Sequence, residues 1–271
     1  MKITFLGTGG GRFTTITQLR ATGGWILEIG GQKISVDPGP GALVKAKEFG
    51  VGLRALSGVV VSHCHPDHYT DAEVMIEAMT RGAKEKRGFL LSNENVIKGG
   101  DGGYVQRISP YHLKSLERYE IMEPGKKVSV GDVEIAATRA VHTEPKTIGF
   151  VFSGAESLGY VSDTEYFHGI EKQYKGCGYL VLNCMRPRDV DWPKHMNSEA
   201  ARKIISGIGP EAAVITHFGM RMLKAGPENE ARWIEEKTGV KVIPARDGME
   251  IDFGKKPLKV KIHRQTMAAF F

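Results

Sequence analysis

The stretch Ser62-His63-Cys64-His65-Pro66-Asp67-His68 follows the apolar run 58–61 and holds three of the chain's nine histidines. A short apolar run of this kind is typical of a buried strand. Because residues two apart on an extended backbone point to the same side, His63 and His65 can bind one ion. The stretch therefore predicts a metal-binding loop at the end of a buried strand.

The second part of this loop adds two more donors. Pro66 excludes a helix here and forces a turn, after which Asp67 and His68 supply an oxygen and a nitrogen aimed at a second position. Imidazole and carboxylate together suit zinc, manganese or iron, whereas calcium and magnesium prefer oxygen alone. The alternatives are a histidine-rich surface loop and a single structural zinc, but structural zinc usually recruits cysteines and this loop offers only Cys64.

Four donors cannot fill two coordination spheres, so the remaining ligands must come from elsewhere in the chain. Three candidates follow later apolar runs: His142 after 133–137, Asp163 after 160–162, and His217 after 213–216. Open α/β sheets place their ligands and reactive groups at the carboxyl ends of strands. A lone histidine or aspartate there is more often a cap or a turn residue, but the shared placement of all three favours one common site.

Together these motifs resemble the metallo-β-lactamase superfamily of hydrolases. Its signature is present as His63-x-His65-x-Asp67-His68, followed in the expected order by His142, Asp163 and His217 and preceded by the aspartate motif Val36-Asp37-Pro38-Gly39. The resemblance runs from Phe5 to near Ile251. It implies an α/β protein folded as a four-layer αβ/βα sandwich, with one domain over residues 1–271.

The same resemblance implies two divalent metal ions, with zinc or manganese favoured and iron as a further option. One ion would be held by His63, His65 and His142, the other by Asp67, His68 and His217, with Asp163 as the bridge. Asp37 would accept a hydrogen bond from a ligand histidine and so fix the tautomer of that histidine.

Two such ions, about 3.5–4 Å apart, bridge a water, lower its pKa toward neutrality and clamp an oxygen of the group under attack. We therefore expect a metal-dependent hydrolase that acts through a metal-bridging hydroxide. Asp67 is also a candidate catalytic residue, because its carboxylate can orient that hydroxide.

The substrate class depends on the segment 194–200 and on the short spacing from His142 to Asp163. Both resemble the ribonuclease Z and cyclic-phosphodiesterase branch, most closely the phosphonate-operon cyclic phosphodiesterase. In that branch a histidine at this place protonates the leaving oxygen, which makes His195 the candidate general acid; a surface histidine before a helix cap is the alternative. Three neighbouring cations either contact phosphate oxygens or form an exposed basic loop: Arg186, Arg188 and Lys194.

We expect a phosphodiesterase acting on cyclic nucleotides or short nucleic-acid phosphodiesters. The segment between His142 and Asp163 is too short for the long arm with which ribonuclease Z grips transfer RNA, and no cysteine set reproduces the structural zinc of the phosphonate-operon relative. The first alternative is a thioester, lactone or other carboxylic ester hydrolase; the second is a noncatalytic nucleic-acid-binding module. The expected partner is an anionic small molecule or short nucleic acid, and a homodimer is left open.

Composition agrees with one layered α/β domain, since 271 residues with 41% hydrophobic side chains can fill a large core. No apolar stretch approaches a membrane span and the amino terminus has no signal-peptide core, so we expect a cytoplasmic protein. The three cysteines have no Cys-x-x-Cys spacing, which argues against a disulfide framework. The net charge of +6 favours anionic substrates, although much of it lies between Lys255 and Arg264.

Local signals predict three helices. The pair Thr70 and Glu73 reads as a capping box for a helix through about Thr80, Asn197 caps a second helix, and a third runs from Pro227 to Gly239. The glycine-rich stretch 7–12 lacks the spacing of a nucleotide-binding loop. Whether it or the stretch 99–103 contacts substrate is left open.

Overall fold

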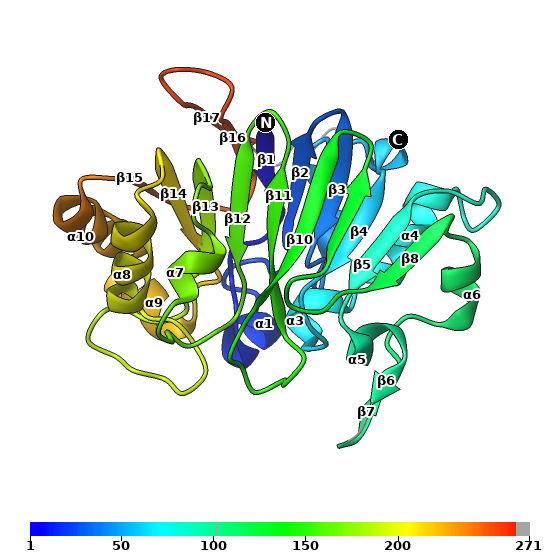
Figure 1. Ribbon diagram of the computed structural model, residues 1–271, viewed down its shortest axis with the longest axis horizontal. Helices are drawn as coiled ribbons and strands as arrows, with labels where there is room; N and C mark the ends of the chain where they lie inside the picture. The colour runs from blue at the N-terminus through cyan, green and yellow to red at the C-terminus, as the bar shows by residue number, and fades with distance from the viewer. Residues whose placement is uncertain (101, 264–271) are drawn as a thin grey trace. The chain divides into compact units, whose positions relative to one another are not determined.

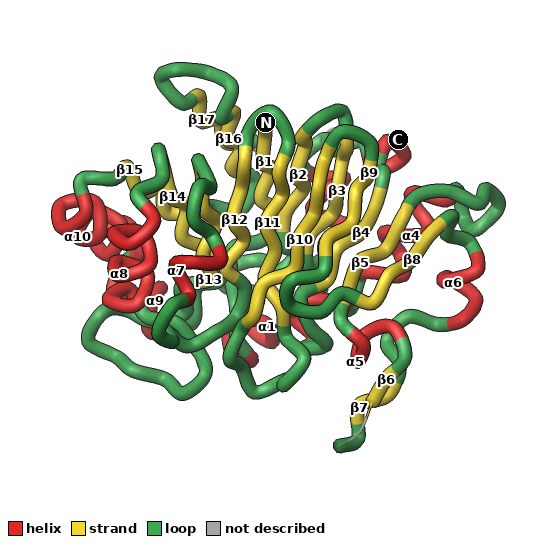
Figure 2. The backbone as a smooth tube through the Cα atoms, viewed as in Figure 1, coloured by secondary structure: helices red, strands yellow, loops and turns green. Residues whose placement is uncertain are grey.

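The computed structural model describes residues 1–100 and 102–263, so Asp101 and the end of the basic tail at Arg264 lie outside the described residues. The chain forms two compact units. Unit 1 contains Met1–Thr8, Arg20–Ile121 and the described part of Arg246–Phe271, and unit 2 contains Gly9–Leu19 and Met122–Ala245. Figures 1 and 2 label the elements of both units.

Unit 1 is built on an eight-stranded mixed sheet with the order β17-β16-β1-β2-β3-β4-β5-β8. Its strands are β1 (Lys2–Phe5), β2 (Trp25–Ile29), β3 (Gln32–Val36), β4 (Gly58–Val61), β5 (Phe89–Ser92), β8 (Arg118–Ile121), β16 (Met249–Asp252) and β17 (Lys259–Ile262). The neighbours β3, β4, β5 and β8 run parallel, and the others pair antiparallel. Every residue of β4 is buried, as expected for a central parallel strand.

The helices of unit 1 lie between these strands in the chain. They are α2 (Ala42–Glu48), the 3₁₀ turn η1 (Leu53–Ala55), α3 (Pro66–Tyr69), α4 (Ala72–Thr80), α5 (Glu94–Ile97) and α6 (Pro110–Lys114). Two short strands, β6 (Gly99–Gly100) and β7 (Tyr104–Val105), form a hairpin after α5. The core packs apolar residues of α2 and α4, such as Ala46 and Ile76, against β4 and β5.

Unit 2 is built on a seven-stranded mixed sheet with the order β15-β14-β13-β12-β11-β10-β9. Its strands are β9 (Lys127–Val130), β10 (Val133–Arg139), β11 (Ile148–Ser153), β12 (Ser157–Val161), β13 (Tyr179–Asn183), β14 (Ala212–Thr216) and β15 (Lys241–Pro244). The strands β12 to β15 run parallel, so their carboxyl ends lie at one edge of the sheet.

The helices of unit 2 are α1 (Arg12–Thr17), α7 (Ile170–Gln173), α8 (Ser198–Ile208), α9 (Met220–Ala225) and α10 (Pro227–Thr238). Figure 2 shows α8, α9 and α10 beside the parallel strands β13 to β15. Ile204 and Ile205 of α8 and Ile234 of α10 pack against apolar residues of β13 and β14. Each unit thus contains a sheet with helices packed on it, the two layers that each half of the predicted sandwich requires.

The predicted start of α8 and the predicted bounds of α10 are confirmed in unit 2. The side chain of Asn197 accepts a hydrogen bond from the amide of Ala200 and caps α8, and α10 runs from Pro227 to a left-handed Gly239. In unit 1 the end of α4 at Thr80 is also as predicted.

The capping box proposed for α4 is wrong. Asp71 is the N-cap residue of α4, and the hydroxyl of Thr70 donates instead to the carbonyl of Pro66. The carboxylate of Glu73 accepts from the amide of Ser109 in another segment, so this tertiary contact replaces the local one. No helix among the described residues is long and apolar enough to cross a membrane.

Candidate metal centre

The histidine-rich loop of unit 1 leaves the carboxyl end of β4. Contrary to the sequence prediction, Pro66 does not exclude a helix, because it occupies the first position of the one-turn helix α3. Proline is well tolerated at that position, since the first amide of a helix has no intrahelical partner. Asp67 and His68 therefore project from a helical turn, and His63 and His65 from the extended segment before it.

Asp37, at the end of β3, organises this loop through three hydrogen bonds. Its Oδ1 accepts from the Ser62 amide at 2.6 Å, and its Oδ2 accepts from the Ser62 hydroxyl at 2.6 Å and pairs with His68 Nδ1 at 2.9 Å. Because an ionised carboxylate only accepts, His68 must carry its proton on Nδ1 and present a lone pair on Nε2. The predicted hydrogen bond between Asp37 and a candidate ligand histidine is therefore present.

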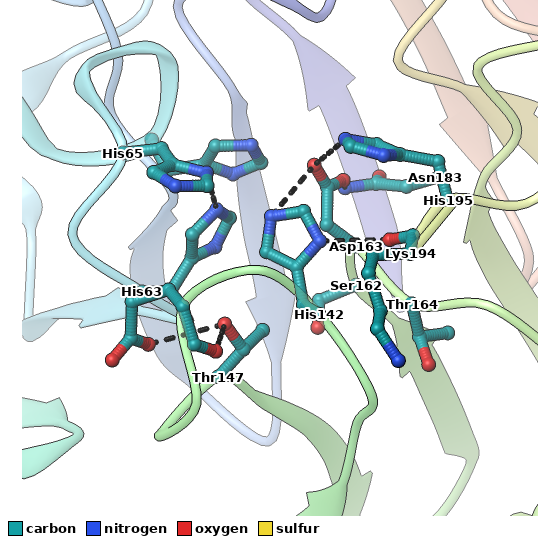
Figure 3. Close-up of polar contacts among 12 residues, drawn as sticks. His63, His65, His142, Thr147, Ser162, Asp163, Thr164, Asn183, Lys194 and His195 are labelled. Carbon is teal, nitrogen blue, oxygen red and sulfur yellow. Dashed lines mark hydrogen bonds and ion pairs between the residues drawn. The ribbon is translucent and has the colours of Figure 1, made fainter. Parts of the chain in front are cut away.

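Ser62 sets the tautomer of His63 in the same way. Its hydroxyl proton points to Asp37, so the hydroxyl oxygen accepts from His63 Nδ1 at 3.0 Å. His63 Nε2 then faces His65 Nδ1 at 3.0 Å, and His68 Nε2 lies 3.8 Å from Asp67 Oδ2 (Figure 3 shows the His63–His65 contact). Unit 1 thus brings together all four donors predicted from the motif.

Unit 2 brings together the remaining predicted donors at the ends of three strands. His142 follows β10, Asp163 follows β12 and His217 follows β14. The carboxylate of Asp163 is the centre of this set: Oδ1 lies 3.4 Å from His217 Nε2, and Oδ2 lies 3.8 Å from His142 Nε2. Each carboxylate oxygen therefore faces a different imidazole, as a bridging ligand requires.

His195, the candidate general acid, belongs to the same set. Its Nε2 lies 3.7 Å from Asp163 Oδ2, and donor atoms of His142, Asp163 and His195 all lie within 4.8 Å of one another. Figure 3 shows the imidazoles of His142 and His195 directed toward this carboxylate. The centroids of the two rings lie 4.7 Å apart in an edge-to-face arrangement.

Main-chain carbonyls orient the two rings. His142 Nδ1 lies 2.8 Å from the carbonyl oxygen of Lys194, and His195 Nδ1 lies 3.0 Å from that of Pro193. Since a carbonyl only accepts, both rings hold a proton on Nδ1 and direct Nε2 toward Asp163. The amide of Asn183 donates to Asp163 Oδ1 at 2.7 Å and holds the carboxylate itself.

Left-handed backbone marks three residues of these networks. Asp37 has φ 47°, Lys194 φ 64° and His217 φ 62°, a region that residues other than glycine rarely adopt. Such a conformation costs on the order of 1 kcal/mol or more and persists where the surroundings over-determine it. In both units the left-handed residue is either a candidate donor, as His217 is, or the hydrogen-bond partner of one, as Asp37 and Lys194 are.

The glycine-rich stretch of unit 2 lies against His217. The amide of Gly10 donates to the carbonyl of Phe218, and a methyl group added at Gly10 would overlap the ring of His217. Only a residue without a side chain fits here. The stretch therefore forms part of the wall around the donor set of unit 2.

The donor chemistry fits a divalent metal. His63, His68, His142, Asp163 and His217 are all buried. The hydrogen bonds at Nδ1 place the lone pair of His63, His68 and His142 on Nε2. A nitrogen and carboxylate set suits zinc, manganese or iron. The cysteines do not contribute, because Cys64 packs in the core of unit 1 and burial raises the pKa of the Cys177 thiol to about 11 and of the Cys184 thiol to about 12.

The cations that follow β13 do not act alike. Arg188 forms a 3.1 Å ion pair with buried Glu230, and Lys194 forms a 2.9 Å ion pair with Glu165. Each of these two side chains is thus occupied by an ion pair within the protein.

Ser62 and Asn183 were missed by the sequence prediction, and the only sequence signal for them is their place at the carboxyl end of an apolar run.

These two sets of buried and half-buried donors, each at the carboxyl ends of strands, define an α/β protein with a candidate metal centre. A family model described as the beta-lactamase superfamily domain matches residues 32–218, and the chain belongs to this metallo-β-lactamase superfamily of hydrolases. The predicted superfamily is confirmed.

Similar proteins cover nearly the whole chain. "Uncharacterized protein MJ1374" of Methanocaldococcus jannaschii is 38% identical over 93% of this chain and 95% of that protein. A ribonuclease Z of Mycolicibacterium gilvum is 26% identical over 97% of this chain and 96% of that protein.

Solved structures share the fold. The metallo-β-lactamase fold protein YhfI from Bacillus subtilis covers 92% of this chain and 98% of its own, with a TM-score of 0.76 and 22% identity. A diphosphatase from the PhnP family covers 93% of this chain and 97% of its own, with a TM-score of 0.68 and 17% identity. The predicted α/β fold class is confirmed. The similarity to a ribonuclease Z agrees with the predicted branch of the superfamily.

Proposed function

We propose that this hydrolase is a metal-dependent phosphodiesterase that cleaves cyclic nucleotides or short nucleic-acid phosphodiesters. The observation that carries the proposal is the Asp163 carboxylate, which faces His142 and His217 through different oxygens while His195 stands beside it. The similarity to a ribonuclease Z and to a PhnP-family diphosphatase supports a phosphorus ester as the substrate.

The proposed ligands are the seven predicted donors, which would hold two divalent ions, zinc or manganese. In this proposal His63, His65 and His142 would hold one ion, Asp67, His68 and His217 would hold the other, and Asp163 would be the ligand they share. When bound, such ions supply an activated water and stabilise negative charge on the group under attack. The fixed Nε2 lone pairs described above support this assignment, because a ligand histidine needs its other nitrogen held by a hydrogen-bond acceptor.

The chain's own residues have two tasks in this proposal. Asp67, half-buried on α3, accepts a hydrogen bond from the attacking water and orients it. His195 donates a proton from Nε2 to the leaving oxygen. Its ring is held for this task, because Nδ1–H donates to the Pro193 carbonyl, and Nε2 lies 3.7 Å from Asp163 Oδ2.

The size of the substrate is suggested by the segment between His142 and Asp163. The strands β11 and β12 pair as an antiparallel hairpin from Phe150 opposite Tyr160 to Ser153 opposite Ser157, and they take up most of this segment. No long arm is left there to grip a folded RNA. Small nucleotides and short single strands therefore fit better than transfer RNA.

One experiment tests the proposal directly. The purified protein is analysed for bound metals and then assayed in parallel on bis(p-nitrophenyl) phosphate, a 2′,3′-cyclic nucleotide and p-nitrophenyl acyl esters, with zinc or manganese added. We expect phosphodiester cleavage that is lost in Asp163→Asn. Cleavage of acyl esters alone would establish the carboxylic ester alternative, and strand binding without any turnover would establish a noncatalytic module.

A further inference from the structure

Arg186 lies between two segments of unit 2 that carry functional side chains. Its amide donates to the carbonyl of Met196, the neighbour of His195, at 3.3 Å. Its neighbour Met185 accepts from the amide of Gly219, two residues after His217, at 3.2 Å. The side chain of Arg186 therefore begins at the carboxyl edge of the sheet, beside the segments of the proposed acid and of a proposed ligand.

The guanidinium of Arg186 is held in place without a counter-charge. It lies over the ring of Trp192, 4.6 Å from the centroid, and its Nε is buried with no hydrogen-bond partner among the described residues. Trp192 is half-exposed and makes a flat platform. A planar guanidinium fixed in this way keeps its donor edge in one orientation.

The electrostatic surroundings of Arg186 are positive. Burial and then the charge of Arg221 lower the pKa of Arg186, and no carboxylate opposes this shift. Arg221 is exposed and forms no ion pair with any residue that the structure describes. Arg188 and Lys194, by contrast, each have a carboxylate partner, so Arg186 alone of these three neighbouring cations is left to meet an external anion.

We propose that Arg186, stacked on Trp192, binds a second phosphate group of the substrate, separate from the phosphodiester that is cleaved. The inference rests on the proposed function and narrows its substrate class to diesters that bear a further phosphate. An oxyanion accepts bidentate hydrogen bonds from the terminal Nη atoms of the guanidinium. A phosphate monoester carries about −1.5 to −2 charges near pH 7, so it complements two neighbouring cations better than a carboxylate does.

The first test compares substrates that differ only in a terminal phosphate. Thymidylyl-thymidine is assayed with and without a phosphate on its 5′ or 3′ end, and the ratio of kcat/KM values is the readout. We expect the parent to prefer one phosphorylated form about 10- to 100-fold, the range of a charge-assisted hydrogen bond. Arg186→Met should lose this preference, and Arg186→Lys should keep only part of it because lysine lacks the planar fork.

Arg232→Met is the matched control. Arg232 is an exposed arginine of α10 in the same unit, so this variant removes the same charge and should keep the full preference. Arg186 is not an anion-binding residue if Arg186→Met keeps the preference of the parent. It is a positioning residue instead if Arg186→Met lowers turnover of all the dinucleotides by the same factor.

A binding measurement separates this inference from the proposed activity. The metal-loaded protein is titrated with thymidine 5′-monophosphate and with thymidine 3′,5′-bisphosphate by calorimetry. The second phosphate should raise affinity about tenfold or more in the parent and not in Arg186→Met. If this holds while no phosphodiester is cleaved, the proposed activity falls and the phosphate site stands; equal affinity for an analogue with a carboxymethyl group in place of one phosphate would overturn the phosphate assignment.

Discussion

The two units supply their donors in different ways. In unit 1 all four donors come from one loop of consecutive residues, and a single carboxylate, Asp37, accounts for the orientation of both His63 and His68. In unit 2 the donors come from separate segments, and main-chain carbonyls and Asn183 orient them. The first arrangement is local in the sequence, whereas the second exists only after parallel strands have brought their ends together.

Asp163→Asn, which changes the donor set of unit 2, should have the largest effect on metal content and turnover. It removes the charge that faces the imidazoles of His142, His195 and His217, so we expect loss of bound metal. Turnover should fall about a thousandfold or more, since a metal ion stabilises the transition state by several kcal/mol. Metal analysis and phosphodiester kinetics measure both. Asp191→Asn, in an exposed loop, is the control; a metal content equal to that of the parent in Asp163→Asn would remove unit 2 from the metal site.

His195→Ala should have the next largest effect and should leave metal content unchanged. General acid catalysis contributes about 10²- to 10⁴-fold. The loss should be large with an alkoxide leaving group and small with p-nitrophenolate, which needs no proton. The assignment is wrong if turnover of the poor leaving group stays within about twofold of the parent.

Asp37→Asn tests the side-chain orientation used by unit 1. An amide has one acceptor oxygen and cannot take all three hydrogen bonds, so metal affinity or activity should fall about 10- to 100-fold. A competition assay with a metal indicator gives the affinity. Asp71→Asn, at the N-cap of α4, is a control in the same unit, and equal losses in both variants would contradict a specific role for Asp37.

Gly10→Ala tests the wall of unit 2. The added methyl group must displace the His217 ring or the backbone, and overpacking of this kind costs about 1–3 kcal/mol. We expect roughly tenfold weaker metal binding. Gly52→Ala is the control, because its methyl group meets open space at an ordinary φ of −74°, and this variant should bind metal like the parent. Unchanged metal affinity in Gly10→Ala would show that the loop can move to accommodate the methyl group.

Glu165→Gln should have the smallest effect. The hydrogen bond from Lys194 is the main cause that lowers the pKa of Glu165, so the ion pair stabilises the fold above the ordinary carboxyl pKa of 4.5 and is lost as pH falls through the lowered value. An exposed pair contributes about 0–1 kcal/mol, or a few degrees in Tm. The Tm values of the parent and the variant should differ slightly at neutral pH and converge in acid; divergence in acid would contradict this sign.

The sequence predicted the fold class, and within each unit the predicted donors lie near one another for a physical reason. Donors at the ends of apolar runs must meet at one edge of a parallel sheet. The groups that orient the His142 and His195 rings could not be predicted. They are the carbonyls of Lys194 and Pro193, and Lys194 is far from His142 in the sequence and meets it only in the folded chain. Lys194 in this loop has a left-handed φ, and nothing about a lysine in the sequence predicts that conformation.

The three cations near His195 show the same limit. Arg186, Arg188 and Lys194 look equivalent in the sequence, yet ion pairs with Glu230 and Glu165 remove two of them from consideration. Their partners lie in other segments, one of them on α10. Charge near a motif is therefore a weak signal until the folded neighbours of each charge are known.

The strand β17 gives the basic tail a role unrelated to substrate. It ends the sheet of unit 1, and Val260 and Ile262 are exposed along it. A strand at such an edge can recruit a strand from another molecule and begin aggregation, and alternating Lys259 and Lys261 make that approach repulsive. Since salt screens this repulsion, concentrated solutions of the protein should aggregate least at low ionic strength.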